Sequence, residues 1–353
     1  MNFRTSKVKS LGIFSPAKNV PAARKGRQIM PIAMAINSPG GPEALQAIEI
    51  TITEPGPGEV RIRQSVIGVN FVDIYYRIGL YPLNAYPAVL GFEGAGTVDA
   101  IGPGVVNVQP GDRVAYHGMP MGAYAEVRVL PESRLAKLPD GISDRVAGST
   151  MLRGLTAHML LHKVHVVRPG DWILVHAAAG GVGQLVTRWA KRLGAHVIGT
   201  VGSEGKAILA KDAGADEVLL HGDGGWVERT RAIADGKGVH LAIDGIGGGM
   251  LAQTLGVVRP FGIAASLGQP AGPIPPVRVE DLGFTRSIAL MRPSSIAYAN
   301  DPELYRRSTA DLLAALQSGL INPIGAEYPL REAARAHADL ESGKTTGSVI
   351  LTV

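Results

Sequence analysis

The pattern of apolar and polar residues changes near residue 154. Before that point the chain has short stretches such as residues 59–63 (EVRIR), in which polar and apolar residues alternate. Turns rich in proline and glycine separate them, for example at residues 55–58 and 110–112. This pattern predicts an antiparallel β module from residue 32 to about residue 154.

Beyond residue 154, apolar runs of strand length alternate with stretches of helical periodicity. Strands are expected at residues 172–177, 196–201, 217–220, 239–244 and 262–267, and helices at about residues 183–193, 204–213, 225–235 and 249–258. This alternation predicts an α/β fold with a doubly wound parallel sheet of the Rossmann type. A helix at residues 301–318 and a last strand at residues 348–353 should then return to the first module.

A glycine turn joins the first of these strands to its helix, within residues 172–183 (WILVHAAAGGVG). Gly180, Gly181 and Gly183, with Val182 among them, leave the backbone open to a pyrophosphate that faces the free N–H groups of the new helix. The spacing is A-x-x-G-x-x-G rather than the G-x-G-x-x-G fingerprint, so a purely structural turn is the alternative.

The end of the second strand bears on the choice of cofactor. An NAD-binding fold places an acid there for the ribose hydroxyls, but this chain has Ser203, with Lys206 three residues beyond. A hydroxyl and an ammonium would hold a 2′-phosphate that a carboxylate would repel, which indicates NADPH rather than NADH. A solvated surface lysine is the alternative interpretation of Lys206.

Composition limits the classes of protein that the chain can belong to. Its 353 residues allow two domains, and the absence of cysteine excludes disulfides and thiolate metal ligands. No apolar run approaches the roughly 20 residues of a membrane span, so we expect a cytoplasmic protein without membrane attachment.

The formal charge of +5 belongs to the first 29 residues, which hold seven basic residues and no acid. The remainder has 28 basic and 30 acidic residues, and this balance argues against a nucleic-acid partner for the body of the protein. We expect residues 1–29 to be a disordered basic extension. A targeting segment, an arm that binds polyanions, or a natural start at Met30 or Met34 are the alternatives.

Seven segments in order then resemble one family. They are residues 70–75 (NFVDIY) continuing to 77–82 (RIGLYP), 91–96 (GFEGAG), 111–114 (GDRV), 154–157 (GLTA), 176–183 (HAAAGGVG) and 346–347 (TG). Together they resemble the zinc-independent medium-chain dehydrogenases/reductases, and within them the NADPH-dependent, zeta-crystallin-like quinone oxidoreductases. The resemblance implies a GroES-like catalytic domain at residues 30–153, completed by residues 295–353, and a Rossmann domain at residues 154–294. It also implies a homodimer that pairs through the apolar stretch at residues 287–291, for which an internal edge strand is the alternative.

The zinc enzymes of that superfamily carry a G-H-E segment whose histidine binds the catalytic metal, and this chain has Phe92 at the histidine position. A catalytic zinc normally needs three protein ligands. His158, His162 and His165 fall on an expected helix, where packing or surface roles are more common. We therefore expect no metal, and hydride donation to an acceptor that is already electrophilic, such as a quinone or an α,β-unsaturated carbonyl.

The resemblance also implies roles for single residues. Asn70 would lie near the nicotinamide, while Tyr75 and Tyr81 would line the substrate cleft and serve catalysis; a turn-forming asparagine and ordinary core or rim tyrosines are the alternatives. The cofactor-binding positions would further include Thr156, Lys206, Leu267, Arg292 and Lys344. His221 stands where the family often has a tyrosine, and Gly343 where it has an arginine. These two departures from the family pattern leave the strictness of the preference for NADPH over NADH open.

The sequence therefore predicts an NADPH-dependent quinone reductase that acts on a small molecule. An enone, alkenal or enoyl-thioester reductase on the same scaffold is the nearest alternative. A crystallin-like or RNA-binding protein that keeps NADPH as a structural ligand is an alternative from another class.

Overall fold

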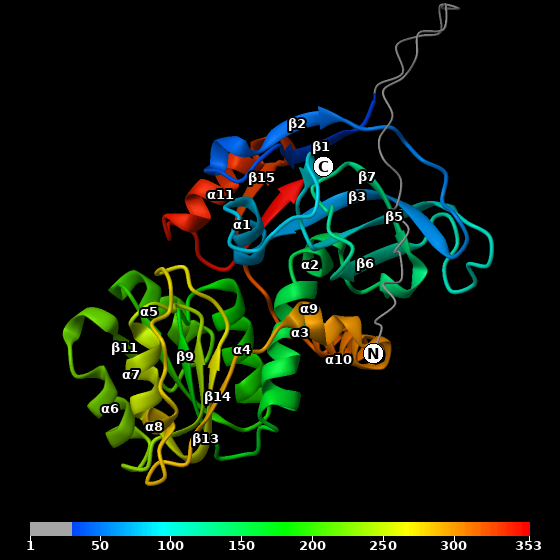
Figure 1. Cartoon of the computed structure of the whole chain (residues 1–353). Helices are drawn as coiled ribbons and strands as arrows, with labels where there is room; N and C mark the ends of the chain where they lie inside the picture. Colours follow the sequence, from blue (N-terminus) through cyan, green and yellow to red (C-terminus); the bar gives the residue numbers. More distant parts are fainter. Residues whose placement is uncertain (1–29) are drawn as a thin grey trace, which may run out of the picture. The chain divides into compact units, whose positions relative to one another are not determined.

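Two large sheets of different kinds organise the chain, as the change of pattern near residue 154 predicts (Figure 1). The structure is a computed structural model that describes residues 30–353. The predictions about residues 1–29 lie outside this part of the chain. The predicted fold class, a Rossmann-type parallel sheet with a GroES-like antiparallel β domain, is confirmed.

The first sheet has seven strands and is mainly antiparallel. Its strands, in spatial order, are β15 (Ile324–Pro329), β16 (Ser348–Thr352), β3 (Glu59–Val69), β5 (Glu93–Ile101), β6 (Arg113–His117) and β8 (Leu135–Lys137), and β7 (Val127–Pro131) also pairs with β3. A smaller sheet consists of β2 (Gln46–Glu49), β1 (Ile32–Ile36) and β4 (Ala88–Val89). We call this region the antiparallel lobe. The last strand, β16, pairs antiparallel with β3, so the C-terminal segment returns to the first module as predicted.

The second sheet has six parallel strands and forms the parallel lobe. Their spatial order is β11 (Glu217–Leu220), β10 (His196–Val201), β9 (Trp172–His176), β12 (Val239–Asp244), β13 (Val258–Ser266) and β14 (Ala289–Met291). Numbered along the chain this is 3-2-1-4-5-6, the order of a dinucleotide-binding sheet. Three of the five predicted strands have the predicted bounds, and the fifth begins four residues earlier, at Val258.

Helices connect these strands and cover both lobes. In the parallel lobe they are α4 (Gly181–Arg192), α5 (Glu204–Asp212), α6 (Trp226–Ile233), α7 (Met250–Val257) and the short α8 (Val279–Leu282). Elsewhere they are α1 (Phe71–Arg77), α2 (Asp144–Gly148), α3 (Met151–Met159), α9 (Ser295–Asn300), α10 (Pro302–Gln317) and α11 (Ala333–Glu341). A π-helical turn, Leu160–Val164, extends α3, and single 3₁₀ turns occupy Pro42–Ala44, Glu132–Arg134, His221–Asp223 and Leu330–Glu332.

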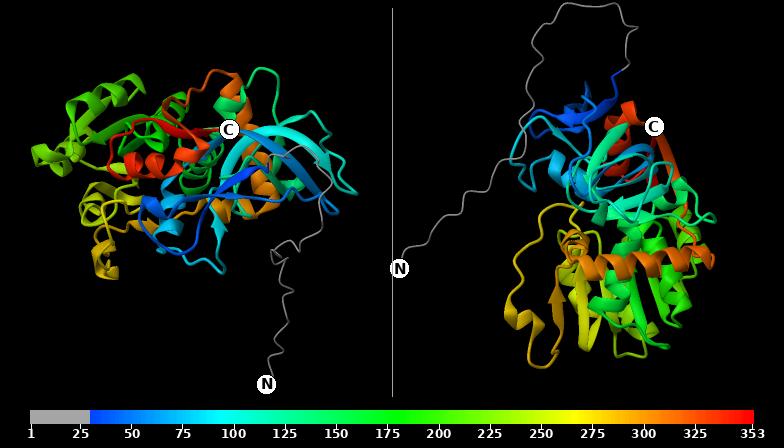
Figure 2. Two further views of the ribbon diagram at one scale, coloured as in Figure 1. Left: turned by 90° about the horizontal axis from the view of Figure 1, so that it is seen from above. Right: turned by 90° about the vertical axis from the view of Figure 1, so that its right-hand side faces the viewer.

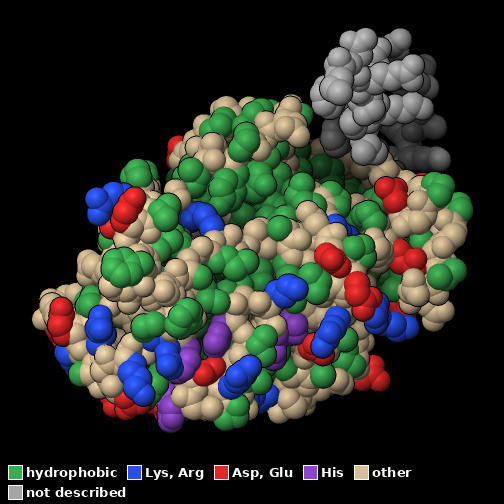
Figure 3. All heavy atoms as spheres, turned by 60° about the horizontal axis from the view of Figure 1, so that its bottom comes forward, with side chains coloured by type: hydrophobic (Ala, Val, Ile, Leu, Met, Phe, Trp, Pro, Cys, Tyr) green, Lys and Arg blue, Asp and Glu red, His purple; other side chains and the backbone are tan. Residues whose placement is uncertain are grey.

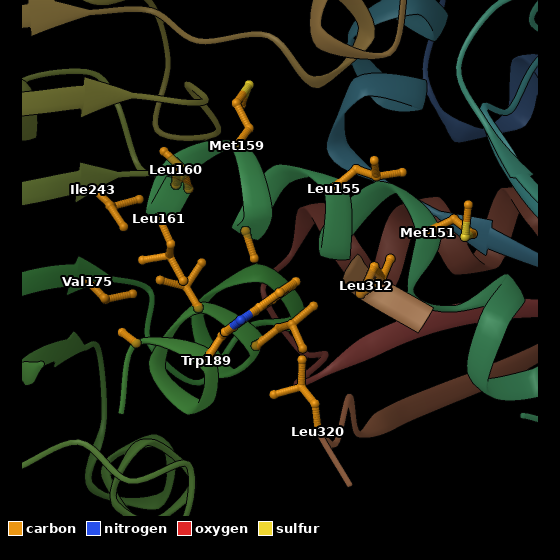
Figure 4. Close-up of a cluster of buried hydrophobic side chains, with 14 of the residues drawn as sticks. Met151, Leu155, Met159, Leu160, Leu161, Val175, Trp189, Ile243, Leu312 and Leu320 are labelled. Atoms are coloured by element: carbon orange, nitrogen blue, oxygen red, sulfur yellow. The ribbon is translucent and has the colours of Figure 1, made fainter. Parts of the chain in front are cut away.

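Helix α3 joins the two lobes. It packs against α4, α9 and α10, and Figure 4 shows side chains of α3 and its π turn gathered with Trp189 of α4 and Leu312 of α10. A Cβ atom on Gly154 would lie 2.4 Å from a methyl carbon of Leu312, so glycine permits this close approach. Because α3 begins at Met151, the proposed domain boundary between residues 153 and 154 falls inside this helix, and residues 31–353 pack as one unit.

Helix α10, predicted at residues 301–318, spans Pro302–Gln317, and Figure 2 shows it as the long orange helix. Asp301 caps it by accepting hydrogen bonds from the N–H groups of Glu303 and Leu304. No helix within residues 30–353 is long and apolar enough to cross a membrane. On the face drawn in Figure 3, basic and acidic side chains are interspersed, and histidines gather on one part of it.

Candidate active site

A cleft of about 600 Å³ is lined by residues of both lobes. The antiparallel lobe contributes Asn70, Tyr75 and Tyr81, and the parallel lobe contributes the glycine turn, Lys206, His221, Leu267 and Arg292. Thr156 of α3 also lines it. Apolar walls with a few convergent polar groups are typical of a small-molecule site. The structure therefore brings twelve of the fourteen predicted site residues to one cleft, all except Ser203 and Lys344.

The glycine turn lies between the carboxyl end of β9 and the first turn of α4. Its conformation leaves no room for side chains: a Cβ on Gly183 would lie 2.4 Å from the carbonyl oxygen of Ala177 and 2.8 Å from the Cα of Ala178. A Cβ on Gly181 would lie 2.6 Å from Nε of Arg153 and 3.0 Å from the carbonyl oxygen of Gly347, so this position is also restricted. The N–H groups of the first helical turn have no partner within the helix, so the turn can bind an anionic phosphate group.

Lys206 lines the cleft from helix α5. Its ammonium donates a hydrogen bond to the carbonyl oxygen of Gly343 at 3.0 Å, which links α5 to the segment that follows α11. Ser203 precedes α5 as its N-cap residue and is exposed outside the lining. Lys344 points to Asp339 instead, at 3.5 Å, with 73% of its side chain exposed. Lys206 is thus the lysine that faces the cleft in this structure.

Tyr75 connects the two lobes across the cleft. Its phenol oxygen accepts a hydrogen bond from the backbone N–H of Gln269 at 2.7 Å, so its own hydrogen remains free to be donated. Burial raises the pKa of Tyr75, which keeps the phenol protonated at neutral pH. Tyr81 packs edge-on against it, with ring centroids 5.5 Å apart. These two rings form an aromatic wall with a hydrogen-bond donor.

Arg292 and Thr156 are held by neighbouring groups. The Arg292 guanidinium donates to the Ser266 hydroxyl at 3.2 Å and to the side-chain oxygen of Gln269 at 3.1 Å. The Thr156 hydroxyl donates to the carbonyl oxygen of Leu152 at 2.7 Å, within its own helix. Both side chains therefore have fixed orientations at the edge of the cleft.

Asn70 is positioned by two buried carboxylates. Its backbone N–H donates to Asp73, and its side-chain amide donates to Glu93, each at 2.7 Å. Glu93 is completely buried and also accepts from the backbone N–H of Leu152 at 2.7 Å and from Arg153 at 3.0 Å. Burial raises the pKa of Glu93, while the charge of Arg153 and these hydrogen bonds oppose the rise.

Arg153, which was not predicted from the sequence, lines the cleft and is only 5% exposed. Besides Glu93, its guanidinium donates to the carbonyl oxygens of Val69 at 2.6 Å and Ser149 at 3.1 Å. It thereby connects the end of β3, the start of β5 and the end of α2. The sequence signal for Arg153 was its position within the apolar helix MLRGLTAHM, because a charged residue in such a helix usually has a buried partner.

The position of a zinc ligand in related enzymes is apolar in this chain. Phe92 is fully buried and packs against Tyr76, with ring centroids 5.2 Å apart. Within residues 30–353, no group of three or more histidine, cysteine or acidic residues could hold a metal ion. His158 bonds to Tyr298 and Asp311, and His165 bonds to Asp171, so both have structural partners.

Comparison with known proteins agrees with this class of site. The model of the alcohol dehydrogenase GroES-like domain matches residues 56–140, and that of the zinc-binding dehydrogenase family matches residues 181–307. Both models describe domains of medium-chain dehydrogenases/reductases.

Individual relatives narrow the class. The chain is 42% identical to a quinone oxidoreductase of Pseudomonas aeruginosa over 88% of this chain and 96% of that protein. It is 39% identical to a 2-haloacrylate reductase of Burkholderia over 91% and 99% of the two chains. A crystal structure of the Escherichia coli quinone oxidoreductase complexed with NADPH matches with a TM-score of 0.88 and 38% identity, over 91% and 100% of the two chains. The chain therefore belongs to the quinone oxidoreductase family of the medium-chain dehydrogenases/reductases.

Proposed function

We propose that this protein reduces quinones by hydride transfer from NADPH without a metal. The observation that carries the proposal is the single cleft in which a phosphate-binding glycine turn and the pair Tyr75 and Tyr81 face the same space. The family relationship supports it, since relatives at about 40% identity are named quinone oxidoreductases.

The glycine turn fits the pyrophosphate of NADPH, because a side chain at Gly183 would collide with the backbone of Ala177 and Ala178 and force open the tight turn that presents its N–H groups. When bound, NADPH supplies the hydride. Lys206 would bind the 2′-phosphate, and Asn70, held by Glu93, would fix the nicotinamide side of the cleft. The free hydrogen of the Tyr75 phenol would then be donated to the acceptor oxygen on which negative charge develops.

A screen of acceptors tests the substrate class. NADPH oxidation would be followed by its absorbance with quinones, alkenals and enoyl thioesters, and we expect the highest kcat/KM for a quinone. The relative named 2-haloacrylate reductase makes a conjugated alkene the second candidate class of acceptor. Turnover confined to alkenals or enoyl thioesters would move the assignment to that class.

Replacing Lys206 by alanine is expected to raise the KM for NADPH roughly 10-fold or more. The reason is the loss of a charge-assisted contact of about 1.5–3 kcal/mol with the 2′-phosphate. The KM for NADH should change little, since NADH lacks that phosphate. Lys211→Ala is the matched control, because Lys211 lies on the same helix, donates to the carbonyl oxygen of Asp216 and is outside the cleft lining. Equal effects on both cofactors would refute the assignment of Lys206.

Activity is expected to survive exhaustive chelation. The chain has no cysteine and carries Phe92 where zinc enzymes have a histidine ligand, so the three protein ligands of a catalytic zinc are missing. Turnover and zinc content would be measured before and after dialysis against a chelator. One zinc per chain, with activity lost on its removal and regained on its return, would contradict the proposal.

We also propose that the protein is a homodimer. Strand β14 is the last strand of the parallel sheet, and the predicted apolar stretch at residues 287–291 contains it. Exposed apolar side chains accompany this edge of the sheet, among them Phe261 at 88% and Phe284 at 96% exposure. An unpaired edge of this kind is stabilised by pairing with a second copy across a two-fold axis. Light scattering should give twice the mass of one chain at micromolar concentration, and the mass of one chain would contradict the dimer.

A further inference from the structure

A chain of hydrogen bonds runs through the parallel lobe and ends at the wall of the cleft. Thr254 of α7 contacts Nε2 of His176 at 2.9 Å, and Nδ1 of His176 contacts the hydroxyl of Thr200 at 2.6 Å. The Thr200 hydroxyl in turn contacts Nε2 of His221 at 2.6 Å. The first three residues are at most 3% exposed, whereas His221 is half-buried and lines the cleft.

Thr254 sets the direction of these hydrogen bonds. Its hydroxyl donates its only hydrogen to the carbonyl oxygen of Met250 at 2.9 Å, so its oxygen accepts from Nε2–H of His176. Burial lowers the pKa of His176 to about 3, which leaves this ring neutral with an accepting Nδ1. Thr200 must then donate to His176 and accept from His221, and His221 carries its hydrogen on Nε2.

The other ring nitrogen of His221 determines what this residue can bind. Nδ1 lies on the far side of the ring from Thr200, and nothing within residues 30–353 hydrogen-bonds to it. In neutral His221 this nitrogen can only accept a hydrogen bond, and it donates only after protonation. A ribose hydroxyl can donate to the neutral form, whereas a phosphate dianion offers only acceptors and needs the protonated form.

We propose that His221, fixed by this chain of hydrogen bonds as the Nε2–H tautomer, makes the selection of NADPH over NADH depend on pH. Protonated His221 donates from Nδ1 to the 2′-phosphate, and neutral His221 accepts from the 2′-hydroxyl. The placement supports this role, because His221 follows β11 and Lys206 lies in the helix after the adjacent β10, at the edge where a dinucleotide-binding sheet holds the ribose. The inference rests on the proposed function, in which the cleft binds NADPH.

The charged groups around His221 set the pH window. Burial lowers the pKa of His221 and the charge of Asp244, at the end of β12, opposes this. His176 lies behind it on β9, and Lys206 faces the same cleft from α5. Asp223 lies in the same 3₁₀ turn as His221, and its carboxylate is 4.0 Å from the guanidinium of Arg229. A bound phosphate raises the pKa of His221, so the gain in NADPH affinity is complete below the pKa of the free protein and is lost as the pH rises through the pKa of the complex.

Calorimetric titration of the full chain with NADPH and NADH tests this directly. Measurements between about pH 6 and 8.5, in buffers of different ionisation enthalpy, give both the Kd and the protons taken up. We expect NADPH to bind about 10-fold more weakly at the upper limit, with proton uptake over the pH range in which its affinity changes, whereas NADH should neither weaken there nor take up protons. His221→Phe should abolish both effects. Any pH dependence that remains in this variant reports the ionisation of the 2′-phosphate itself, which occurs near about pH 6.

Thr254→Val tests the chain of hydrogen bonds without touching the cleft. Valine cannot accept from Nε2–H of His176, so the tautomer of His176 should invert. Thr200 would then donate to Nε2 of His221, and neutral His221 would present Nδ1–H to the cleft. This variant should bind NADPH more tightly than the unchanged protein at pH 8.5 and take up fewer protons. Nitrogen NMR of labelled histidine, assigned with His221→Phe, should show Nε2–H in the unchanged protein and Nδ1–H in Thr254→Val.

The possible failures are distinguishable. NADPH binding with the same pH dependence in the unchanged protein and in His221→Phe would overturn this inference and leave the proposed function standing. An Nδ1–H tautomer of His221 in the unchanged, unliganded protein would also overturn it. No NADPH binding at any pH would overturn both this inference and the proposed function.

Discussion

Replacing Arg153 by methionine is expected to lower the free energy of unfolding by about 3–5 kcal/mol, because Glu93 would remain as a buried carboxylate without its cation. Glu93 is completely buried, so solvent cannot compensate for the lost charge. Chemical denaturation measures the change. Turnover should fall as well, because Asn70 depends on Glu93 for the orientation of its amide.

The loss of stability in Arg153→Met should be larger at high pH than at low pH. Burial already raises the pKa of Glu93 from its ordinary value of 4.5, and removing Arg153 removes a group that opposes the rise. An acid whose pKa is higher in the folded state destabilises that state at higher pH. The stability of Arg153→Met should therefore recover as the pH falls through the raised pKa toward 4.5.

Two variants separate the charge of Arg153 from its packing. The double variant Arg153→Met/Glu93→Gln removes both charges and should regain much of the lost stability, since neither charge is left unpaired. Arg153→Lys keeps the charge but loses the fork of donors to Val69 and Ser149, so we expect an intermediate effect. A double variant that is less stable than either single variant would contradict the role of this ion pair.

Replacing Gly183 by alanine should weaken NADPH binding roughly 10-fold to 100-fold. The added Cβ would lie 2.4 Å from the Ala177 oxygen and 2.8 Å from the Ala178 Cα, and backbone atoms of a tight turn cannot move aside cheaply. Opening the turn would cost about 1–3 kcal/mol of strain and would displace the N–H groups that we propose bind the pyrophosphate. Fluorescence titration with NADPH measures the effect.

Gly205→Ala is the matched control for that experiment. Gly205 lies in the first turn of α5, and nothing is within 4 Å of an added Cβ. Alanine is the better helix former, so stability should stay the same or rise slightly. If Gly183→Ala bound NADPH as tightly as Gly205→Ala, the glycine turn would not be the phosphate site.

Most of the fold could be predicted because its signals are local. The strands at residues 196–201, 217–220 and 239–244 were bounded correctly, since each is a short apolar run between turn residues. The domain boundary between residues 153 and 154 stays a prediction. Helix α3 is buried on all sides against both lobes, so its sequence has no polar stretch at which a linker could be recognised.

The site was predictable only where a motif marks a residue. Asn70, Tyr75 and the glycine turn belong to recognisable segments and do line the cleft. Arg153 and the partners of His221 could not be found in this way, because their roles depend on contacts between residues far apart in the sequence, such as Thr254 with His176. The cofactor-binding role of Lys344 stays a prediction, since a motif position does not determine that its side chain will turn toward Asp339.

The most direct test of the account is a single turnover with NADPH deuterated at C4 of the nicotinamide, mixed rapidly with the protein, a quinone and a chelator. If hydride passes directly from NADPH to the quinone in this cleft, one NADPH should be oxidised for each hydroquinone formed, with a primary isotope effect on the fast phase. Oxidation of NADPH that requires added zinc, or that produces semiquinone radicals without an isotope effect, would contradict metal-free hydride transfer.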